Sequence, residues 1–165
     1  MNDANPDAID ATDYRILREL SADGRSSDVA LSERVNLSST AVARRRKILE
    51  ESGAIGGYSA DLDLARLGFG IVVIVMIELS SQAEPALVEF ETAVIACPSM
   101  SYCSFVSGST DFLMIVHVRS LADYDRVYRS ELSTLPHVAR VRSSFVLREV
   151  MQRSVPPAVL TSRTT

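Results

Sequence analysis

The sequence predicts an α+β protein, with an N-terminal winged helix-turn-helix followed by a ferredoxin-like βαββαβ domain. The first third has helical periodicity broken by short turns, whereas the remainder alternates Val- and Ile-rich segments with amphipathic ones. Hydrophobic residues make up 47% and charged residues 23% of the 165 residues, as in globular proteins. We place the helix-turn-helix and a short β wing in residues 1–62, a linker in 63–68, the ferredoxin-like domain in 69–155 and a C-terminal tail in 156–165.

Two short helices are expected first. Asp10 is a suitable N-cap for the first helix, and Gly24 is a natural breaker after it. Ser27 can cap the second helix. The inner faces of the two helices would carry Ile16, Leu17 and Leu20, and then Val29, Leu31 and Val35.

A tight turn leads into a third helix. Asn36 ends the second helix, and asparagine tolerates the left-handed backbone that such a turn requires. The third helix begins at Ser38 or Ser39, runs to about Ser52 and is stopped by Gly53. Residues 55–62 have β character and are expected to form the wing.

The remaining residues follow the order β-α-β-β-α-β. The helices of such a fold cover one face of the sheet, and the other face here is still apolar. We therefore expect a homodimer that buries this face. The expected strands are 69–79, 102–106, 112–118 and 138–150, and the expected helices are 84–96 and 121–135.

The spacing of polar residues on the third helix favours DNA binding. Thr40, Arg44 and Lys47 recur at i, i+4 and i+7 and so share one face, opposite the apolar Val42 and Leu49. This arrangement offers an apolar back for docking and a cationic front for a duplex groove. The net charge of −4 argues mildly against nucleic acid, but binding depends on the local run of four cations at 44–47.

The start of the third helix adds hydroxyl groups and backbone amides that can bind phosphate. A charged surface helix in an interaction domain is the alternative, and the turn spacing and facial segregation together favour DNA. The predicted DNA-binding residues are Ser38, Ser39, Thr40, Arg44, Arg45 and Lys47.

Long stretches in both halves resemble the Lrp/AsnC family, the feast/famine regulators. They are IDATDYRILREL, LSERVNLSSTAVARRRKILEESGAIGGYSADLD, FVSGSTDFLMIVHV and HVARVRSSFVLREV, in that order from Ile9 to Val155. The resemblance implies that 39–51 is a recognition helix. It also implies a C-terminal domain that senses amino acids or related metabolites and forms dimers, commonly octamers.

The chain departs from the family pattern at three positions. Asn36 stands where a glycine is usual, Ser32 where an alanine is usual, and Arg46 where an aliphatic residue is usual. A buried unpaired arginine is costly. We therefore expect the stem of Arg46 to pack while its head reaches water or an acid such as Glu50.

The resemblance places the effector around the turn at 107–111. Gly108 would let backbone amides approach a carboxylate, the hydroxyls can donate hydrogen bonds, and Asp111 would brace the loop or receive an ammonium group. A simple hairpin turn capped by Asp111 is the alternative. The turn comprises Ser107, Gly108, Ser109, Thr110 and Asp111, and the expected lining is Tyr102, Ser104, Phe112 and Ser144.

Other features argue against metal, cofactor and membrane. Cys97 and Cys103 lack metal-ligand spacing and are expected to be reduced interior residues, while His117 and His137 are isolated. The longest apolar run, 69–77, is about half of a membrane helix. The acidic N-terminus lacks the features of a secretory signal, so we expect a cytoplasmic protein.

The predicted function is sequence-specific transcription regulation, in which an amino acid or related metabolite changes the oligomeric assembly, and no enzymatic activity is expected. One alternative is an enzyme like the siroheme decarboxylases, which would require a cluster of cations and a proton donor around a tetrapyrrole. Another is a metabolite-sensing partner that has lost DNA binding. Tetrapyrrole uptake would support the enzyme, and absence of DNA affinity would support the partner.

Overall fold

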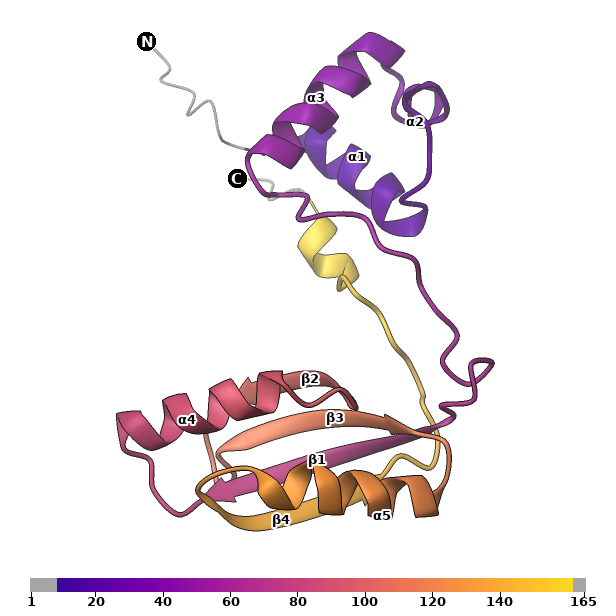
Figure 1. Ribbon diagram of the computed structural model, residues 1–165. Helices are drawn as coiled ribbons and strands as arrows, with labels where there is room; N and C mark the ends of the chain where they lie inside the picture. Colours follow the sequence, from indigo (N-terminus) through magenta and orange to yellow (C-terminus); the bar gives the residue numbers. More distant parts are fainter. Residues whose placement is uncertain (1–8, 162–165) are drawn as a thin grey trace. The chain divides into compact units, whose positions relative to one another are not determined.

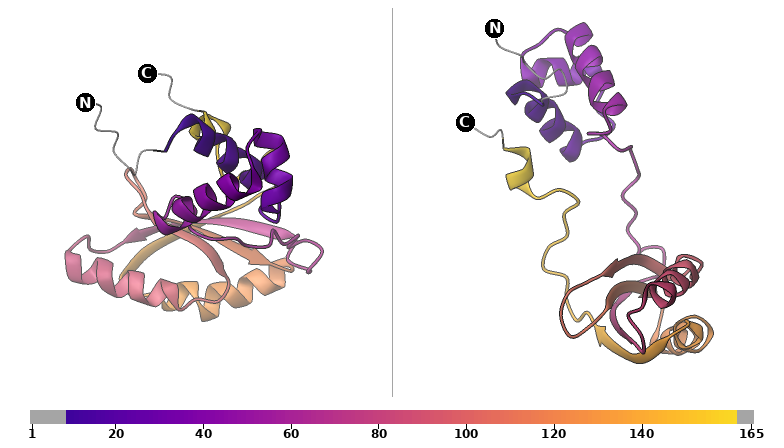
Figure 2. Two further views of the ribbon diagram at one scale, coloured as in Figure 1. Left: turned by 90° about the horizontal axis from the view of Figure 1, so that it is seen from above. Right: turned by 90° about the vertical axis from the view of Figure 1, so that its left-hand side faces the viewer.

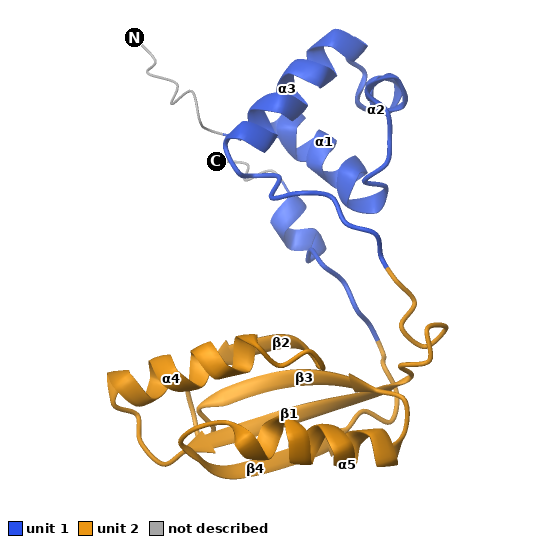
Figure 3. Cartoon of the chain, in the orientation of Figure 1, with its two compact units in different colours: residues 1–61, 151–165 blue, residues 62–150 orange. Residues whose placement is uncertain are grey.

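The computed structural model describes residues 9–161, which divide into two compact units (Figures 1 and 3). The helical unit comprises residues 9–61 together with 151–161, and the sheet unit comprises residues 62–150. The sequence-based boundaries differ at the C-terminal side, because residues 151–155 group with the helical unit rather than with the sheet.

Three helices form the helical unit: α1 (Ala11–Ala22), α2 (Asp28–Val35) and α3 (Ser39–Glu51). Each begins at the predicted cap. The side chain of Asp10 accepts from the backbone N–H groups of Thr12 and Asp13, and Ser27 and Ser38 cap α2 and α3 in the same way. The core contains Ile16, Leu20, Leu31, Val35, Val42 and Leu49.

Two expectations for this unit are wrong. Val29 does not face the core, because its side chain is 62% exposed on the outer side of α2. Residues 55–62 form no wing strand: the segment pairs with no other described strand, and Gly56 and Gly57 disfavour regular β structure. A turn at 64–68 lies in the expected linker, closed by the N–H of Leu67 donating to the carbonyl of Asp63 at 3.2 Å.

The C-terminal segment returns to the helical unit. Residues Pro157–Leu160 form a short 3-10 helix, η2, against α1, where Arg18 Nη2 donates to the carbonyl of Leu160 at 3.0 Å. The predicted C-terminal tail, residues 156–165, thus contains a short 3-10 helix, and its last residues, 162–165, lie outside the described residues.

The sheet unit has four antiparallel strands in the order β2-β3-β1-β4. Two helices, α4 and α5, lie on one face of the sheet (Figures 1 and 2). This is the predicted ferredoxin-like order. The elements are β1 (Ile71–Leu79), α4 (Glu84–Ile95), β2 (Met100–Phe105), β3 (Phe112–Val118), α5 (Leu121–Ser130), η1 (Leu132–Thr134) and β4 (Val138–Phe145).

Alternation along the strands separates the two faces of the sheet. One set of side chains enters the core under α4 and α5, including Val75 and Ile77 of β1 and Met114 of β3. The other set is half-buried and has no helix over it; its apolar members include Val72, Ile74, Met76, Leu113 and Ile115. Strand β4 ends before the predicted Val150 because β1, the strand with which it pairs among residues 9–161, begins at Ile71.

No helix within residues 9–161 is both long and apolar enough to cross a membrane.

Candidate functional site

Helix α3 is docked by one side and exposed on the other. Only Val42 and Leu49 of α3 are buried, whereas Thr40, Arg44 and Lys47 are exposed together on the opposite side, as their spacing predicts. Among the described residues Arg44 makes no ion pair, and Lys47 makes only a weak one, 3.7 Å from Glu51 in solvent. Such surface pairs contribute little, so both cations are free to meet an anionic partner.

The turn before α3 has the predicted geometry. Asn36 adopts a left-handed backbone with φ of 54°, and its N–H donates to the carbonyl of Ser32. The N–H of Leu37 donates to the same carbonyl at 3.1 Å, and Ser38 then caps α3. The hydroxyl groups of Ser38, Ser39 and Thr40 therefore lie at the exposed start of the helix.

Arg45 holds α3 against α1. Its Nη1 lies 2.8 Å from both Asp10 Oδ2 and Asp13 Oδ1. The hydrogen bond that Arg45 donates to the Asp13 carboxylate is the main reason that the pKa of Arg45 is raised. Burial acts to raise the pKa of Asp10, but hydrogen bonds from the Asp13 backbone and Arg45 outweigh it, and the pKa is lowered. The Nη1 group of Arg45 is therefore occupied within the protein.

The stem of Arg46 is largely buried, as expected, and its guanidinium has more partners than Glu50 alone. Its Nε donates to Tyr58 Oη at 2.8 Å, and its Nη1 donates to Asp28 Oδ1 at 3.1 Å and to the carbonyl of Ser26 at 3.2 Å. Glu50 lies 3.4 Å from Nε and accepts from Tyr58 Oη at 2.7 Å. The guanidinium also lies over the Tyr58 ring, 4.9 Å from its centroid.

The loop at 107–111 joins β2 to β3, with Gly108 at φ of 130°. Asp111 braces this loop. Its side chain is buried, with Oδ2 accepting from the N–H of Leu79 at 2.7 Å and Oδ1 from Gln82 Nε2 at 2.6 Å. Both oxygens are thus satisfied inside the protein, so of the two expected roles for Asp111 the structure supports the brace.

The predicted lining residues do not come together. Phe112 is 2% exposed and packs in the core, 4.4 Å from Phe90 between ring centroids, because the alternation of β3 turns it toward the helices. Tyr102 and Ser144 belong to opposite edge strands. They lie at the two ends of one row of register partners, with Ile115 and Ile74 between them. Three strand spacings separate them by about 14 Å within one chain. Ser104 lies beside Tyr102, and its Oγ donates to Tyr102 Oη at 2.7 Å.

Sequence reasoning missed Arg142. Its Nη2 donates to Thr110 Oγ1 of the loop at 3.2 Å and to Glu78 Oε1 at 2.6 Å. Arg140 lies 3.7 Å from the same carboxylate. Residues two apart in a strand share a face, so the spacing of Arg140 and Arg142 in β4 was the sequence signal that both lie on the open face.

The cysteines and histidines form no site among the described residues, where no three metal-ligating side chains gather. Burial raises the pKa of both Cys97 and Cys103, as for interior thiols. His137 Nε2 lies 2.8 Å from Glu89 Oε2. Nδ1 of His117 is buried without a hydrogen-bond partner within residues 9–161.

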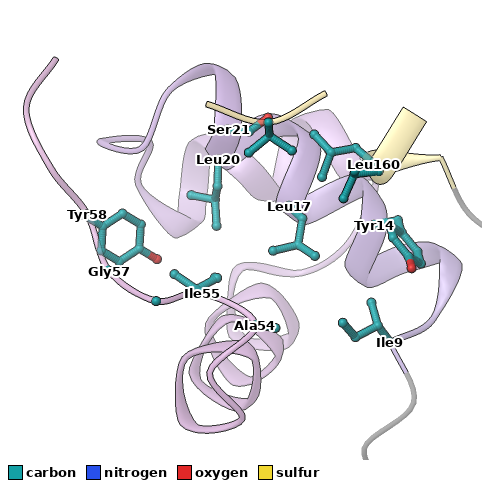
Figure 4. A pocket seen from close by; sticks show the side chains of 13 residues that line it. Ile9, Tyr14, Leu17, Leu20, Ser21, Ala54, Ile55, Gly57, Tyr58 and Leu160 are labelled. Atoms are coloured by element: carbon teal, nitrogen blue, oxygen red, sulfur yellow. The ribbon is translucent and has the colours of Figure 1, made fainter. Parts of the chain in front are cut away.

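A cavity of about 430 Å³ lies in the helical unit beside α1 (Figure 4). Its walls come from α1, from residues 54–58 after α3, and from the returning C-terminal segment. Most of its lining is apolar: Ile9, Tyr14, Leu17, Leu20, Ser21, Ala54, Ile55, Gly56, Gly57, Tyr58, Val155, Val159 and Leu160.

Comparison with known proteins matches both units. Residues 9–50 match the AsnC-type helix-turn-helix domain, and residues 72–156 match the Lrp/AsnC ligand binding domain. The chain is 39% identical over 150 residues to a proline dehydrogenase transcriptional activator of Rhodobacter capsulatus, covering 91% of this chain and 97% of the relative. It is 38% identical to a Bkd operon transcriptional regulator of Pseudomonas aeruginosa, covering 90% and 97%.

Solved structures agree with the fold. A transcriptional regulator of Neisseria meningitidis, crystallised as a complex with L-Met, superposes with a TM-score of 0.87 at 30% identity, covering 93% of this chain and all of that one. The family resemblance and the α+β fold class, with a helix-turn-helix before a ferredoxin-like domain, are thereby confirmed. The chain belongs to the Lrp/AsnC family of transcriptional regulators.

Proposed function

We propose that this protein is a sequence-specific DNA-binding transcription regulator in which α3 enters a duplex groove. The observation that carries this proposal is the outward face of α3, where Thr40, Arg44 and Lys47 are exposed opposite a docked apolar side. Guanidinium and ammonium groups can bind guanine or phosphate, and the helix start at 38–39 suits a phosphate. A protein that acts on chromosomal DNA in this way works in the cytoplasm.

Ion pairing within the unit explains how an acidic chain retains a cationic face. Arg45 and Arg46 are neutralised by carboxylates on the inner side of α3, which leaves the charge of Arg44 and Lys47 outside. We therefore remove Arg45 from the proposed DNA contacts and retain Ser38, Ser39, Thr40, Arg44 and Lys47.

The test replaces both outward cations. Arg44→Ala combined with Lys47→Ala should lower affinity for the region upstream of the protein's own gene by about 100-fold or more, measured by mobility shift. Wild-type binding should weaken steeply with salt. Arg126→Ala combined with Arg129→Ala removes two cations from α5 and is the matched control. Unchanged affinity in the α3 variant, with native oligomeric state, would refute the assigned DNA-reading face.

The open face of the sheet supports a homodimer. Its apolar centre is only half-buried in one chain, and a second copy would cover it. Ile74→Asp, at the centre of this face, should give monomers by light scattering after size exclusion. The proposed further assembly to an octamer comes from the family resemblance, and the same measurement on the wild-type chain tests it.

An amino acid is the proposed effector, bound around the 107–111 loop. The Neisseria relative was crystallised with L-Met. In this chain the loop offers Gly108, three hydroxyl-bearing residues and the neighbouring guanidinium of Arg142, which together suit a carboxylate. The proposed contacts are Ser107, Gly108, Ser109, Thr110 and Arg142, with Ser104 and Tyr102 nearby and Ser144 on the far edge strand. Such a ligand acts by binding one oligomeric assembly more tightly than another.

A thermal-shift series with the twenty amino acids tests the effector. A selective rise in Tm is expected, because binding only to the folded state stabilises it by mass action. Arg142→Gln should remove the rise, whereas Arg148→Gln, an exposed arginine outside the sheet, should keep it. A rise that persists in the Arg142 variant would contradict the proposed site, and no rise with any amino acid would contradict the effector class.

A further inference from the structure

The inner side of α3 has an unusual construction. Its two buried apolar residues, Val42 and Leu49, lie about two helical turns apart. The turn between them carries Arg45 and Arg46, so polar contacts replace apolar packing at the middle of the docked side. Apolar contacts are non-directional, whereas hydrogen bonds to a guanidinium depend on angle as well as distance.

The two arginines hold α3 toward different elements. Arg45 pairs with the start of α1, through Asp10 and Asp13. Arg46 pairs with the start of α2 through Asp28, and with the segment after α3 through Tyr58. Rotation of α3 about its axis would lengthen contacts to one of these elements, so the pairs together resist that rotation.

A small rotation matters at the outer face. A side chain extends about 6 Å from the helix axis, so a rotation of about 20° moves its end by about 2 Å. That displacement exceeds the tolerance of a hydrogen bond to a base edge. The outward Arg44 and Lys47 therefore depend on what fixes the inner side.

We propose that Arg46 is a positioning residue for DNA recognition: held by Asp28, Glu50 and Tyr58, it fixes the rotation of α3 and thereby the base sequence that α3 reads. This inference rests on the proposed DNA-binding function. The Arg46 side chain is only 20% exposed and four partners occupy its Nε and Nη1, so it acts through α3 rather than by contact with DNA.

Tyr58 links the Arg46 contacts to the segment that follows α3. Its hydroxyl accepts from Arg46 and donates to Glu50, so residue 58 is tied to two successive turns of α3. The segment that follows α3 therefore contacts α3 again at Arg46, through Tyr58. Removing the Tyr58 hydroxyl should loosen the same rotation without removing the ring that packs against the guanidinium.

The experiment compares wild type, Arg46→Met, Tyr58→Phe and the double variant. Two duplexes of equal length are used: the best sequence that the wild-type protein selects from a random library, and an unselected one. Fluorescence anisotropy gives the affinity ratio between them and the salt dependence of each. Circular dichroism and melting establish that each variant is folded at the assay temperature. Arg129→Met, which removes an exposed arginine of α5, is the control.

Arg46→Met is expected to lower the affinity ratio about tenfold with an unchanged salt slope. Tyr58→Phe should lower it about threefold, and the double variant should be no worse than Arg46→Met, because both act through one cluster. Equal loss on both duplexes with a shallower salt slope would identify Arg46 as a phosphate contact and overturn the proposal. An unchanged ratio in folded Tyr58→Phe and Arg46→Met would also overturn it.

Two further outcomes separate this inference from the function on which it rests. If the wild-type protein selects no sequence and binds no duplex, both proposals fail. If Arg46→Met does not fold, Tyr58→Phe alone decides, since it retains the aromatic ring and all apolar contacts of α3.

Discussion

Helix α3 and strand β1 each pack against two neighbouring elements of their unit, yet they are held in different ways. Strand β1 pairs on both sides with neighbouring strands and sends Val73, Val75 and Ile77 into the core. Helix α3 buries only Val42 and Leu49 and is otherwise fixed by Arg45 and Arg46.

Stability and positional precision come from different kinds of interaction in the two units. The sheet unit has a continuous core that includes Phe90, Phe112 and Leu132, whereas six buried residues make the core of the helical unit. Apolar contacts are non-directional, whereas the hydrogen bonds of Arg45 and Arg46, which hold the middle of the docked side of α3, are directional. We therefore expect core truncation to affect the stability of the sheet unit, and changes to polar groups to affect the helical unit.

The largest expected effect comes from the core of the sheet. Phe90 is fully buried and packs against Phe112, so Phe90→Ala should lower the free energy of unfolding of the sheet unit by about 3–5 kcal/mol. Val88→Ala, on the exposed side of the same helix, is the control and should cost little. Denaturant unfolding measures both. A small loss in Phe90→Ala would contradict a sheet unit that is stabilised by its apolar core.

A smaller effect is expected at the turn between α2 and α3. Asn36 has a left-handed backbone that alanine adopts only at a cost, so Asn36→Ala should destabilise the helical unit by about 1 kcal/mol. Asn36→Gly should leave stability unchanged or raise it, because glycine adopts this backbone freely. Hydrogen exchange of the α2 and α3 amides measures the stability of the helical unit separately from that of the sheet unit. Equal effects of alanine and glycine would show that the asparagine side chain, not its backbone, holds the turn.

The smallest expected effect is a pH dependence at the start of α1. The pKa of Asp10 is lowered in the folded protein, so its charged form stabilises the fold at neutral pH, and this contribution is lost as pH falls below the usual value of 3.8. Asp10→Asn keeps a good N-cap but removes the charge that faces Arg45. Its Tm should therefore fall less between pH 5 and pH 3 than the wild-type Tm, as followed by circular dichroism. An identical fall would contradict a stabilising role for this charge.

The fold was largely predictable because local signals agreed with it. Asp10, Ser27 and Ser38 cap the three helices as expected, and β3 has both of its predicted ends. Errors occurred where the outcome depends on a partner segment. The expected wing at 55–62 and the end of β4 failed because a strand requires a neighbour, which local β propensity does not reveal.

The candidate site was predictable on its outer side and less so on its inner side. Helical spacing placed Thr40, Arg44 and Lys47 outside, but it could not show that distant carboxylates capture Arg45. Beside the 107–111 loop, the alternation of β3 turns Phe112 into the core rather than toward the loop. Arg142 was missed because it reaches the loop across the sheet rather than along the chain.

The returning C-terminal segment makes the helical unit discontinuous in sequence. The N-terminal stretch that ends at residue 61 lacks η2, which contributes Val159 and Leu160 to the wall beside Leu17 and Leu20. Excising that stretch for a binding assay would uncover apolar surface that the intact chain shields.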